Sequence, residues 1–190
     1  ALASCSEKQG YPGGDRVGLA LVSSMGHNSL HCEETMKNIL VLGIGNLLLT
    51  DDGVGVHAVR QLLEEVWPPS VKLLDAGTFT QDIFYLFEGY EELLILDIVH
   101  AGKEPGTLYL LSEEQLVRDE SRRLSIHDID LLDSLDMAER LHGKRPRLVI
   151  IGMEPQDFTS WSMELSPAVQ ENFPAFLELA RREIRARLTD

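Results

Sequence analysis

The sequence predicts an α/β protein: a three-layer α/β/α sandwich built on a twisted, mostly parallel, mixed sheet of five strands. Two observations predict this fold. Apolar runs of strand length alternate with longer segments in which apolar residues recur every three or four positions. In addition, the run at residues 93–96 is apolar throughout, which is typical of a strand buried on both faces of a parallel sheet.

The first unit of this pattern lies at residues 39–56, which read ILVLGIGNLLLTDDGVGV. An apolar run that ends at Gly43 is followed by a second glycine, by paired aspartates and by helical spacing of valine and leucine. This order predicts a buried strand, a tight loop and a helix that ends near Pro68. Asp51 or Asp52 is the predicted N-cap of that helix.

The rest of the chain continues the alternation. The strand at 107–111 follows the one before it by a connection too short for a crossover helix, so it is predicted to run along an edge. Ser166 and Pro167 form a cap signature for the last helix, in which Pro174 is expected to introduce a kink. The further elements are predicted as a strand at 71–74, a helix at 79–89, strands at 93–96 and 107–111, a partly helical surface stretch at 113–123, a helix from 125 to 143, a strand at 148–151 and a helix at 168–188.

Length and cysteine usage predict one domain in a reducing compartment. Residues 36–190 suffice for a single α/β domain, whereas residues 1–35 lack sustained periodicity and are expected to be a poorly ordered extension or leader. Both cysteines, Cys5 and Cys32, fall in that first segment. The domain therefore has neither a disulfide framework nor a thiol nucleophile, and a cytoplasmic location is expected.

Charge and hydropathy exclude two classes of partner. The net charge of −14 would repel a phosphate backbone, and no stretch clusters Lys and Arg as nucleic-acid binding requires. The apolar runs fall far short of the ~20 residues needed to cross a bilayer, so no membrane insertion is expected. Hydrophobic content of 44% and charged content of 25% are typical of a soluble globular protein.

Three polar residues stand where strands end or helices begin: Asp52, Asp97 and His127. Strand ends that precede helices meet at one edge of a parallel sheet, so these residues can converge although they are far apart in sequence. Two carboxylates and an imidazole suit a divalent transition metal such as zinc or nickel, whereas calcium prefers more oxygen ligands. The positive end of a helix dipole would keep the His127 ring neutral and able to bind metal.

Each of these residues also has a purely structural interpretation. Asp51 and Asp52 can act as helix caps, Asp97 can form a turn, and His127 can belong to an ordinary cap region. The glycines suggest a second function, because residues 43–46 begin like a dinucleotide fingerprint. The third glycine position is Leu48, however, and two negative charges stand where a pyrophosphate would bind. A nucleotide- or metal-binding α/β module without peptidase activity is the alternative.

From Met36 onward the sequence resembles the hydrogenase maturation endopeptidases, which trim the C-terminal extension from the large subunit of nickel–iron hydrogenases. The resemblance lies in an ordered set of motifs: GIGNLLLTDDGVGV, DAGT at 75–78, LLILDIV with Asp97, PGT at 105–107 and His127 at the start of a helix. It implies cleavage of one peptide bond in the large-subunit precursor after nickel insertion. The nickel would then be carried mainly by the substrate, although zinc or another divalent ion could occupy the site in isolation.

The resemblance also implies roles for particular residues. Asp52, at a position where the family has Glu or Asp, would contact nickel together with Asp97 and His127. Family classification implies an aspartic-type peptidase, yet the D-T/S-G signature of the pepsin group is lacking. Two mechanisms stay open: a metal that acts as a Lewis acid, or nickel that only docks the substrate while Asp52 or Asp97 acts as general base. Three further residues are implied to support the site or shape a substrate loop: Asp51, Asp75 and Thr78.

Overall fold

The computed structural model of this chain describes residues 37–78, 83–118, 123–124 and 127–189. The predicted division into residues 1–35 and a domain of residues 36–190 stays a prediction, because residues 1–36 lie outside the described part. Among the described helices, none combines the length and the apolar character that crossing a bilayer requires.

A mixed sheet forms the centre of the domain, with its main strands in the order β2-β1-β3-β6-β4. β1, β2, β3 and β6 run parallel, whereas β4 pairs antiparallel with β6 at an edge, as predicted. The two-residue strand β5 pairs antiparallel with the end of β3. The strands span Ile39–Ile44 (β1), Val71–Gly77 (β2), Glu92–His100 (β3), Leu108–Ser112 (β4), Arg123–Leu124 (β5) and Arg147–Met153 (β6).

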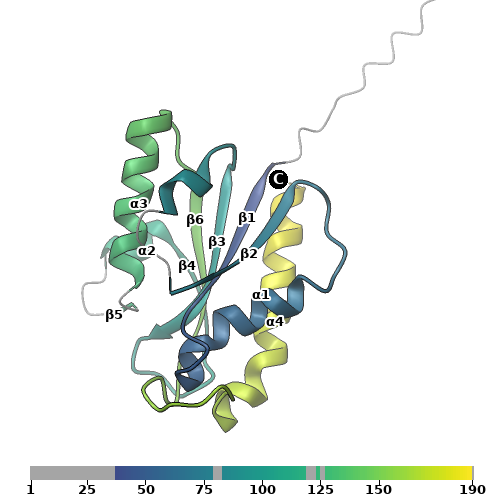
Figure 1. Cartoon of the computed structure of the whole chain (residues 1–190), viewed down its shortest axis with the longest axis vertical. Helices are drawn as coiled ribbons and strands as arrows, with labels where there is room; N and C mark the ends of the chain where they lie inside the picture. The colour runs from purple at the N-terminus through teal and green to yellow at the C-terminus, as the bar shows by residue number, and fades with distance from the viewer. Residues whose placement is uncertain (1–36, 79–82, 119–122, 125–126, 190) are drawn as a thin grey trace, which may run out of the picture. The chain divides into compact units, whose positions relative to one another are not determined.

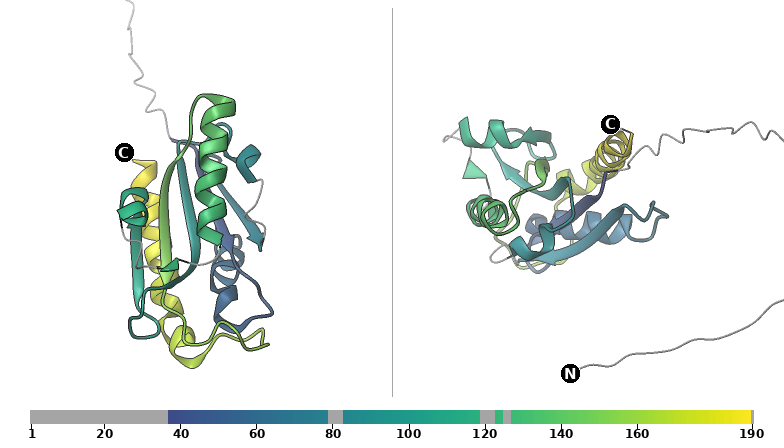
Figure 2. Two further views of the ribbon diagram at one scale, coloured as in Figure 1. Left: turned by 90° about the vertical axis from the view of Figure 1, so that its left-hand side faces the viewer. Right: turned by 90° about the horizontal axis from the view of Figure 1, so that it is seen from above.

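Helices cover both faces of this sheet, which confirms the predicted three-layer arrangement. α1 and α4 pack on one face, and α3 packs with η2 on the other (Figures 1 and 2). They span Thr50–Gly53 (η1), Val54–Leu62 (α1), Ile83–Phe87 (η2), Glu113–Arg118 (α2), His127–His142 (α3) and Pro167–Leu188 (α4).

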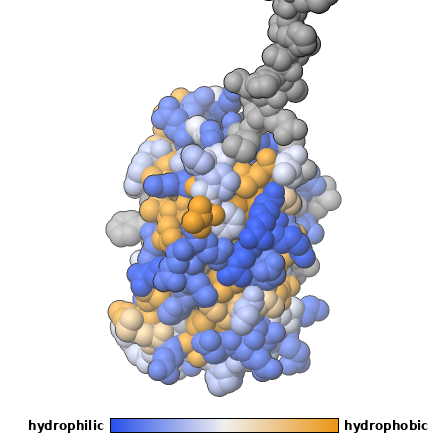
Figure 3. All heavy atoms as spheres, turned by 90° about the vertical axis from the view of Figure 1, so that its right-hand side faces the viewer, coloured by the Kyte–Doolittle hydropathy of each residue, from blue (hydrophilic) through white to orange (hydrophobic). Residues whose placement is uncertain are grey.

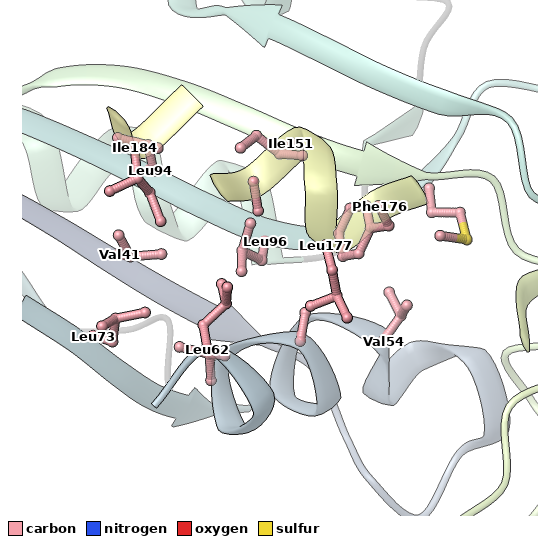
Figure 4. Close-up of a cluster of buried hydrophobic side chains, with 14 of the residues drawn as sticks. Val41, Val54, Leu62, Leu73, Leu94, Leu96, Ile151, Phe176, Leu177 and Ile184 are labelled. Atoms are coloured by element: carbon pink, nitrogen blue, oxygen red, sulfur yellow. The ribbon is translucent and has the colours of Figure 1, made fainter. Parts of the chain in front are cut away.

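Alternating residues of each strand supply two hydrophobic cores. On β3, Leu94 and Leu96 point toward α1 and α4, whereas Leu93 and Ile95 point toward η2 and α3. Figure 4 shows the first core, where Leu62 of α1 and side chains of α4 meet the strand residues. Because side chains alternate along a strand, Asp97 shares the face of Leu93 and Ile95 and so lies on the α3 side.

Several predicted boundaries are wrong. β3 is longer than the apolar run at 93–96, because pairing with β6 continues through Ile98 and pairing with β5 continues through His100. Asp97 therefore lies within the strand rather than at its end. The first helix ends at Leu62 rather than near Pro68, and the indole Nε1 of Trp67 donates to the carbonyl of Leu62 at 2.9 Å.

The helix predicted at 79–89 is a 3-10 helix at Ile83–Phe87 in its described part, and residues 79–82 lie outside the described residues. Its end residues Ile83 and Phe87 are buried. The helix predicted from 125 begins at His127 in the described part, and residues 125–126 lie outside it. It ends at His142, before Gly143, as expected.

The predicted N-cap role of the paired aspartates is also wrong. The 3-10 turn η1 precedes α1, so both aspartates lie inside that turn, and Gly53 is the N-cap of α1 without a side-chain hydrogen bond. Later in the chain, Ser166 does occupy the N-cap position of α4, followed by Pro167 as predicted. Its hydroxyl, however, bonds to Asp51 rather than to its own helix.

Candidate functional site

Glycines bring the start of α1 against the ends of two strands. A Cβ on Gly55 would lie 1.9 Å from the carbonyl oxygen of Leu96 and 2.5 Å from that of Ile44. A Cβ on Gly43 would lie 2.4 Å from the carbonyl oxygen of Gly55. Only residues without side chains permit this approach, so the glycines of the first motif serve helix–strand packing. The contact places η1, which carries Asp52, beside the carboxyl edge of β1 and β3.

Asp52 is half-buried in η1, and its side chain turns back to the loop after β1. Its Oδ2 accepts a hydrogen bond from the backbone N–H of Asn46 at 2.7 Å. Gly45, with φ of +130°, makes room for this loop, because a Cβ there would lie 1.7 Å from the carbonyl oxygen of Asp52. A carboxylate thus takes the N–H that a phosphate would need in a dinucleotide site, which argues against nucleotide binding.

Strained backbone precedes the aspartates. Thr50 has φ of +39°, a conformation that β-branched residues rarely adopt. Its N–H donates to the carbonyl of Ser162 at 2.8 Å and its Oγ1 donates to the carbonyl of Ser160 at 2.8 Å. Strain of this kind persists where surrounding contacts enforce it, and it is common at functional sites.

Asp97 is the most enclosed of the predicted site residues on the sheet, with 1% of its surface exposed. Its Oδ1 accepts the N–H of Ile98 at 2.7 Å, and its register partner on β6 is Gly152. Because β3 also packs against η1, the structure brings Asp97 and Asp52 to the same edge of the sheet from segments far apart in sequence.

His127 is the first residue of α3, and its side chain lies outside the described residues. Its backbone position follows from topology. β5 pairs Leu124 with Val99, two residues beyond Asp97, and α3 begins three residues after Leu124 (Figure 1). Asp97 faces the layer that contains α3. The backbone at the start of α3 therefore lies near the end of β3 that carries Asp97.

Asp75 and Thr78 lie apart from this group, on the β2 side of the edge. Both line a pocket of about 220 Å³ together with Asn46 and Arg60. The carboxylate of Asp75 accepts from Arg60 Nε at 2.8 Å and from the N–H of Gly77 at 3.0 Å. Asn46 connects this pocket to Asp52, because its N–H bonds to that carboxylate. The predicted supporting role of both residues stays a prediction.

Asp51 faces away from the pocket and is fully buried. Its Oδ2 accepts from the N–H groups of Gln156 and Asp157 and from the hydroxyl of Ser166, each at 2.8 Å. Its Oδ1 accepts the N–H of Ser166 at 2.7 Å. Asp51 therefore ties η1 to the segment between β6 and α4, and it positions the loop around Asp52 rather than contacting a ligand.

The sequence did not single out a third buried acid at this edge, Glu154. Glu154, directly after β6, accepts from the N–H of Ala101 at 3.0 Å, the N–H of Gly102 at 3.1 Å and the hydroxyl of Tyr109 at 2.5 Å, and it lies 3.2 Å from His100 Nδ1. Burial alone would raise the pKa of Glu154, but these donors outweigh it and the pKa is lowered. The signal that selected Asp97, an acid next to an apolar run, would also have found Glu154.

The electrostatic character of the edge follows from sequence. Residues 38–59 and 148–180 contain no Lys or Arg, and they form β1, η1, most of α1, all of β6 after Arg147, and the start of α4. Asp51, Asp52 and Glu154 all lie in these segments. Together with the carboxylate of Asp97 on β3, such an edge favours a cation, a positively charged partner or a proton-accepting role in hydrolysis.

Comparison with known proteins identifies the chain. A family model described as "Hydrogenase maturation protease" matches residues 56–183. The chain belongs to this family. The matched range contains Asp97 and His127, and it begins four residues after Asp52.

Individual maturation proteins support the same assignment. The chain is 34% identical over 147 residues to the hydrogenase expression/formation protein HupD of Bradyrhizobium diazoefficiens, with 76% of each protein covered. It is 32% identical over 155 residues to the hydrogenase 2 maturation protease of Escherichia coli, covering 80% of this chain and 91% of that protein.

Solved structures of maturation proteases share the fold. The hydrogenase maturating endopeptidase HybD from Escherichia coli superposes with a TM-score of 0.69 at 30% identity, covering 78% of this chain and 93% of HybD. The [NiFe] hydrogenase maturation protease HybD from Thermococcus kodakarensis gives a TM-score of 0.64 at 28% identity, covering 76% and 97%. The predicted α/β sandwich and the predicted family are both confirmed.

Proposed function

We propose that this maturation protease is an endopeptidase that removes the C-terminal extension from the large-subunit precursor of a nickel–iron hydrogenase after nickel insertion. The observation that carries the proposal is the convergence of Asp52, Asp97 and the start of α3 at one edge of the sheet. A buried acid, a half-buried acid and a helix that begins with His127 supply two carboxylates and an imidazole in a chain of this protease family.

Nickel enters the proposal as part of the substrate. Carboxylate oxygen and imidazole nitrogen are ligands that a divalent transition ion accepts. Asp52, Asp97 and His127 would contact the ion held by the precursor, and the lack of Lys and Arg in residues 38–59 and 148–180 favours its approach. Metal loading of the precursor would thereby become a condition for its cleavage.

A carboxylate then assists hydrolysis of the scissile bond. One of the two aspartates accepts a proton as a water oxygen attacks the carbonyl carbon, and the proton passes to the leaving amine as the C–N bond breaks. The rigid placement of both carboxylates supports this role. The Asp52 carboxylate accepts the N–H of Asn46, and hydrogen bonds of Asp51 hold the turn η1 in place. Asp97 lies within a strand that is paired with β6. This is the aspartic-type chemistry that the family classification implies.

The test uses purified precursor in two forms, nickel-loaded and nickel-free. The wild-type protein is expected to shorten only the loaded form, seen as a shift in gel mobility and as loss of the C-terminal peptide by mass spectrometry. Equal cleavage of both forms would contradict nickel recognition. Failure to cleave the loaded precursor would contradict the proposed substrate.

A further inference from the structure

Large apolar side chains gather at the surface beside the candidate site. We call the set Leu48, Phe158, Trp161 and Met163 the edge patch. Their exposed fractions are 48%, 38%, 80% and 60%. Hydrophobic residues also reach the surface toward the lower end of the face that carries α1 and α4 (Figure 3). Exposed clusters of large apolar side chains commonly mark interaction sites.

Backbone pairing makes the patch continuous with η1. Leu49 and Ser162 form a parallel bridge, in which the N–H of Ser162 donates to the carbonyl of Leu48 at 3.1 Å. The residues that precede each bridge partner, Leu48 and Trp161, therefore occupy neighbouring positions. At the other end of the patch, the ring of Phe158 lies 5.5 Å from that of His100, the last residue of β3. The patch thus runs along the edge that holds Asp52 and Asp97.

The segment that carries the patch is fixed in place. The carboxylate of Asp51 holds it at Gln156, Asp157 and Ser166. Asp157 Oδ1 accepts the N–H groups of Thr159 and Ser160 at 3.0 Å, and hydrogen bonds from Ser160 and Thr159 lower the pKa of Asp157 to about 2. Apolar side chains that are ordered before a partner arrives lose little entropy on binding, which favours affinity.

His57 of α1 lies beside Met163. The histidine is half-buried, and both residues line the same pocket of about 400 Å³. Burial is the largest influence on the pKa of His57 and lowers it. The edge patch therefore borders α1 as well as η1.

The charge around the patch indicates its partner. Residues 148–180 contain Asp157 and Glu164 near the patch but no Lys or Arg. A matching surface would present apolar side chains together with Lys or Arg, because opposite charges guide association and like charges oppose it. A second copy of this acidic chain would bring Asp157 and Glu164 against the same charges.

We infer that the edge patch docks an apolar, Lys- or Arg-bearing segment of the large-subunit precursor, beside the bond that is cleaved. This inference rests on the proposed function and adds to it the surface that selects the protein substrate. Aromatic residues at the centre of an interface commonly carry much of its binding energy. Trp161 is therefore expected to contribute most.

The experiment measures kcat and KM for nickel-loaded precursor with the Trp161→Ser/Met163→Ser double variant. KM is expected to rise about tenfold or more while kcat at saturation stays within about twofold, because the lost contacts affect binding and not the bond-breaking step. The matched controls are Leu141→Ser on α3 and Val66→Ser after α1, which remove exposed apolar side chains away from the edge. Both are expected to retain the wild-type KM.

The charge variant Glu164→Gln is expected to raise KM severalfold, and added salt should reduce its difference from the wild type.

The outcomes separate the two proposals. If the wild-type protein cleaves the loaded precursor and the double variant has an unchanged KM, the docking inference is wrong while the proposed function stands. If the wild type does not cleave the loaded precursor, the proposed function is wrong, and the docking inference that rests on it is wrong with it. Circular dichroism checks folding, and should the double variant be unfolded, Trp161→Ser alone gives the same comparison. A wild-type dimer that dissociates on Trp161→Ser, seen by sedimentation, would assign the patch to a second copy and overturn the inference.

Discussion

Buried acids lie both at the edge where the parallel strands begin, the amino edge, and at the edge where they end, the carboxyl edge. The hydrogen-bond partners of these acids differ between the two edges. At the amino edge, Glu92 receives the guanidinium of Arg147 through two hydrogen bonds of 3.0 and 2.5 Å, with Arg187 Nε at 3.4 Å and Lys37 Nζ at 3.8 Å. At the carboxyl edge, the Asp51 carboxylate accepts backbone N–H groups and a hydroxyl.

This difference distinguishes a structural edge from the edge that carries the proposed site. Cations of the protein itself compensate the charge of Glu92, so little is left for a ligand. Neutral donors stabilise an ionised carboxylate without cancelling its charge, so the field of Asp51 persists at the carboxyl edge. Buried acids held in this way favour an incoming cation, and the four predictions that follow test whether the two edges divide stability and function as proposed.

The largest effect is expected from the acids of the proposed site. Asp52→Asn and Asp97→Asn each remove a proton acceptor and a charged ligand, and precursor processing is expected to fall by about 10²- to 10⁴-fold. Initial rates on gels measure this loss, and Asp133→Asn, an exposed change on α3, serves as control. Variants that lose thermal stability along with activity would instead support purely structural roles for these acids.

Asp51→Ala is expected to be the strongest destabilising change at the carboxyl edge. Three backbone N–H groups and the Ser166 hydroxyl would lose their acceptor in a buried place, at a cost of about 3 kcal/mol in the free energy of unfolding. Urea denaturation measures it. Asp51→Asn keeps one acceptor oxygen and should lose less. A change below about 0.5 kcal/mol for Asp51→Ala would show that the segment is held by other contacts.

A change at the amino edge should affect stability alone. Arg187→Met removes one of the cations near Glu92 and the partner of Glu183 Oε2 at 2.7 Å, with an expected cost of about 1–2 kcal/mol because Arg147 and Arg182 remain. Processing of the loaded precursor is expected to keep its wild-type rate at a temperature where both proteins are folded. A specific loss of processing would break the distinction between the edges.

The smallest effect concerns pH and Glu154. Its folded-state pKa lies below the ordinary value of 4.5, so its stabilising contribution is present above pH 4.5 and is lost as pH falls through the folded-state pKa. Tyr109→Phe removes one donor, raises that pKa, and is expected to cost about 1 kcal/mol at pH 7. Unfolding measured at pH 7 and at a pH below that folded-state pKa should show the two proteins converging at the lower pH. The exposed Tyr85→Phe is the control, and a constant difference at both values would exclude Glu154 as the cause.

Much of the fold was accessible from sequence because local patterns encode it. The run at 93–96 and the alternation of strands and helices sufficed for the sandwich, and the short connection before 107–111 sufficed for the antiparallel edge strand. Boundaries were less accessible. β3 extends to His100 because β6 and β5 pair with it, and partner strands cannot be read from a local pattern.

The candidate site was accessible in part for the same reason. Asp52 and Asp97 stand out by position, and the structure brings both to one edge. Asp51 was predicted as a possible helix cap, yet its carboxylate accepts hydrogen bonds from residues more than 100 positions away. The two glycines that resembled a phosphate loop proved to be packing sites, because Gly43 lies against the carbonyl of Gly55 and Gly45 lies against the carbonyl of Asp52. Contacts of such long range leave no periodic trace in sequence.

The link between Asp51 and Ser166 also bears on when the protease becomes competent. The two residues are 115 positions apart, so on the ribosome Asp51 emerges long before the donors that its carboxylate requires. Until the chain reaches the start of α4, the turn that carries Asp52 lacks its anchor. A nascent or truncated chain that stops before Ser166 therefore lacks these hydrogen bonds, so the proposed site can form only after residue 166 has been synthesised.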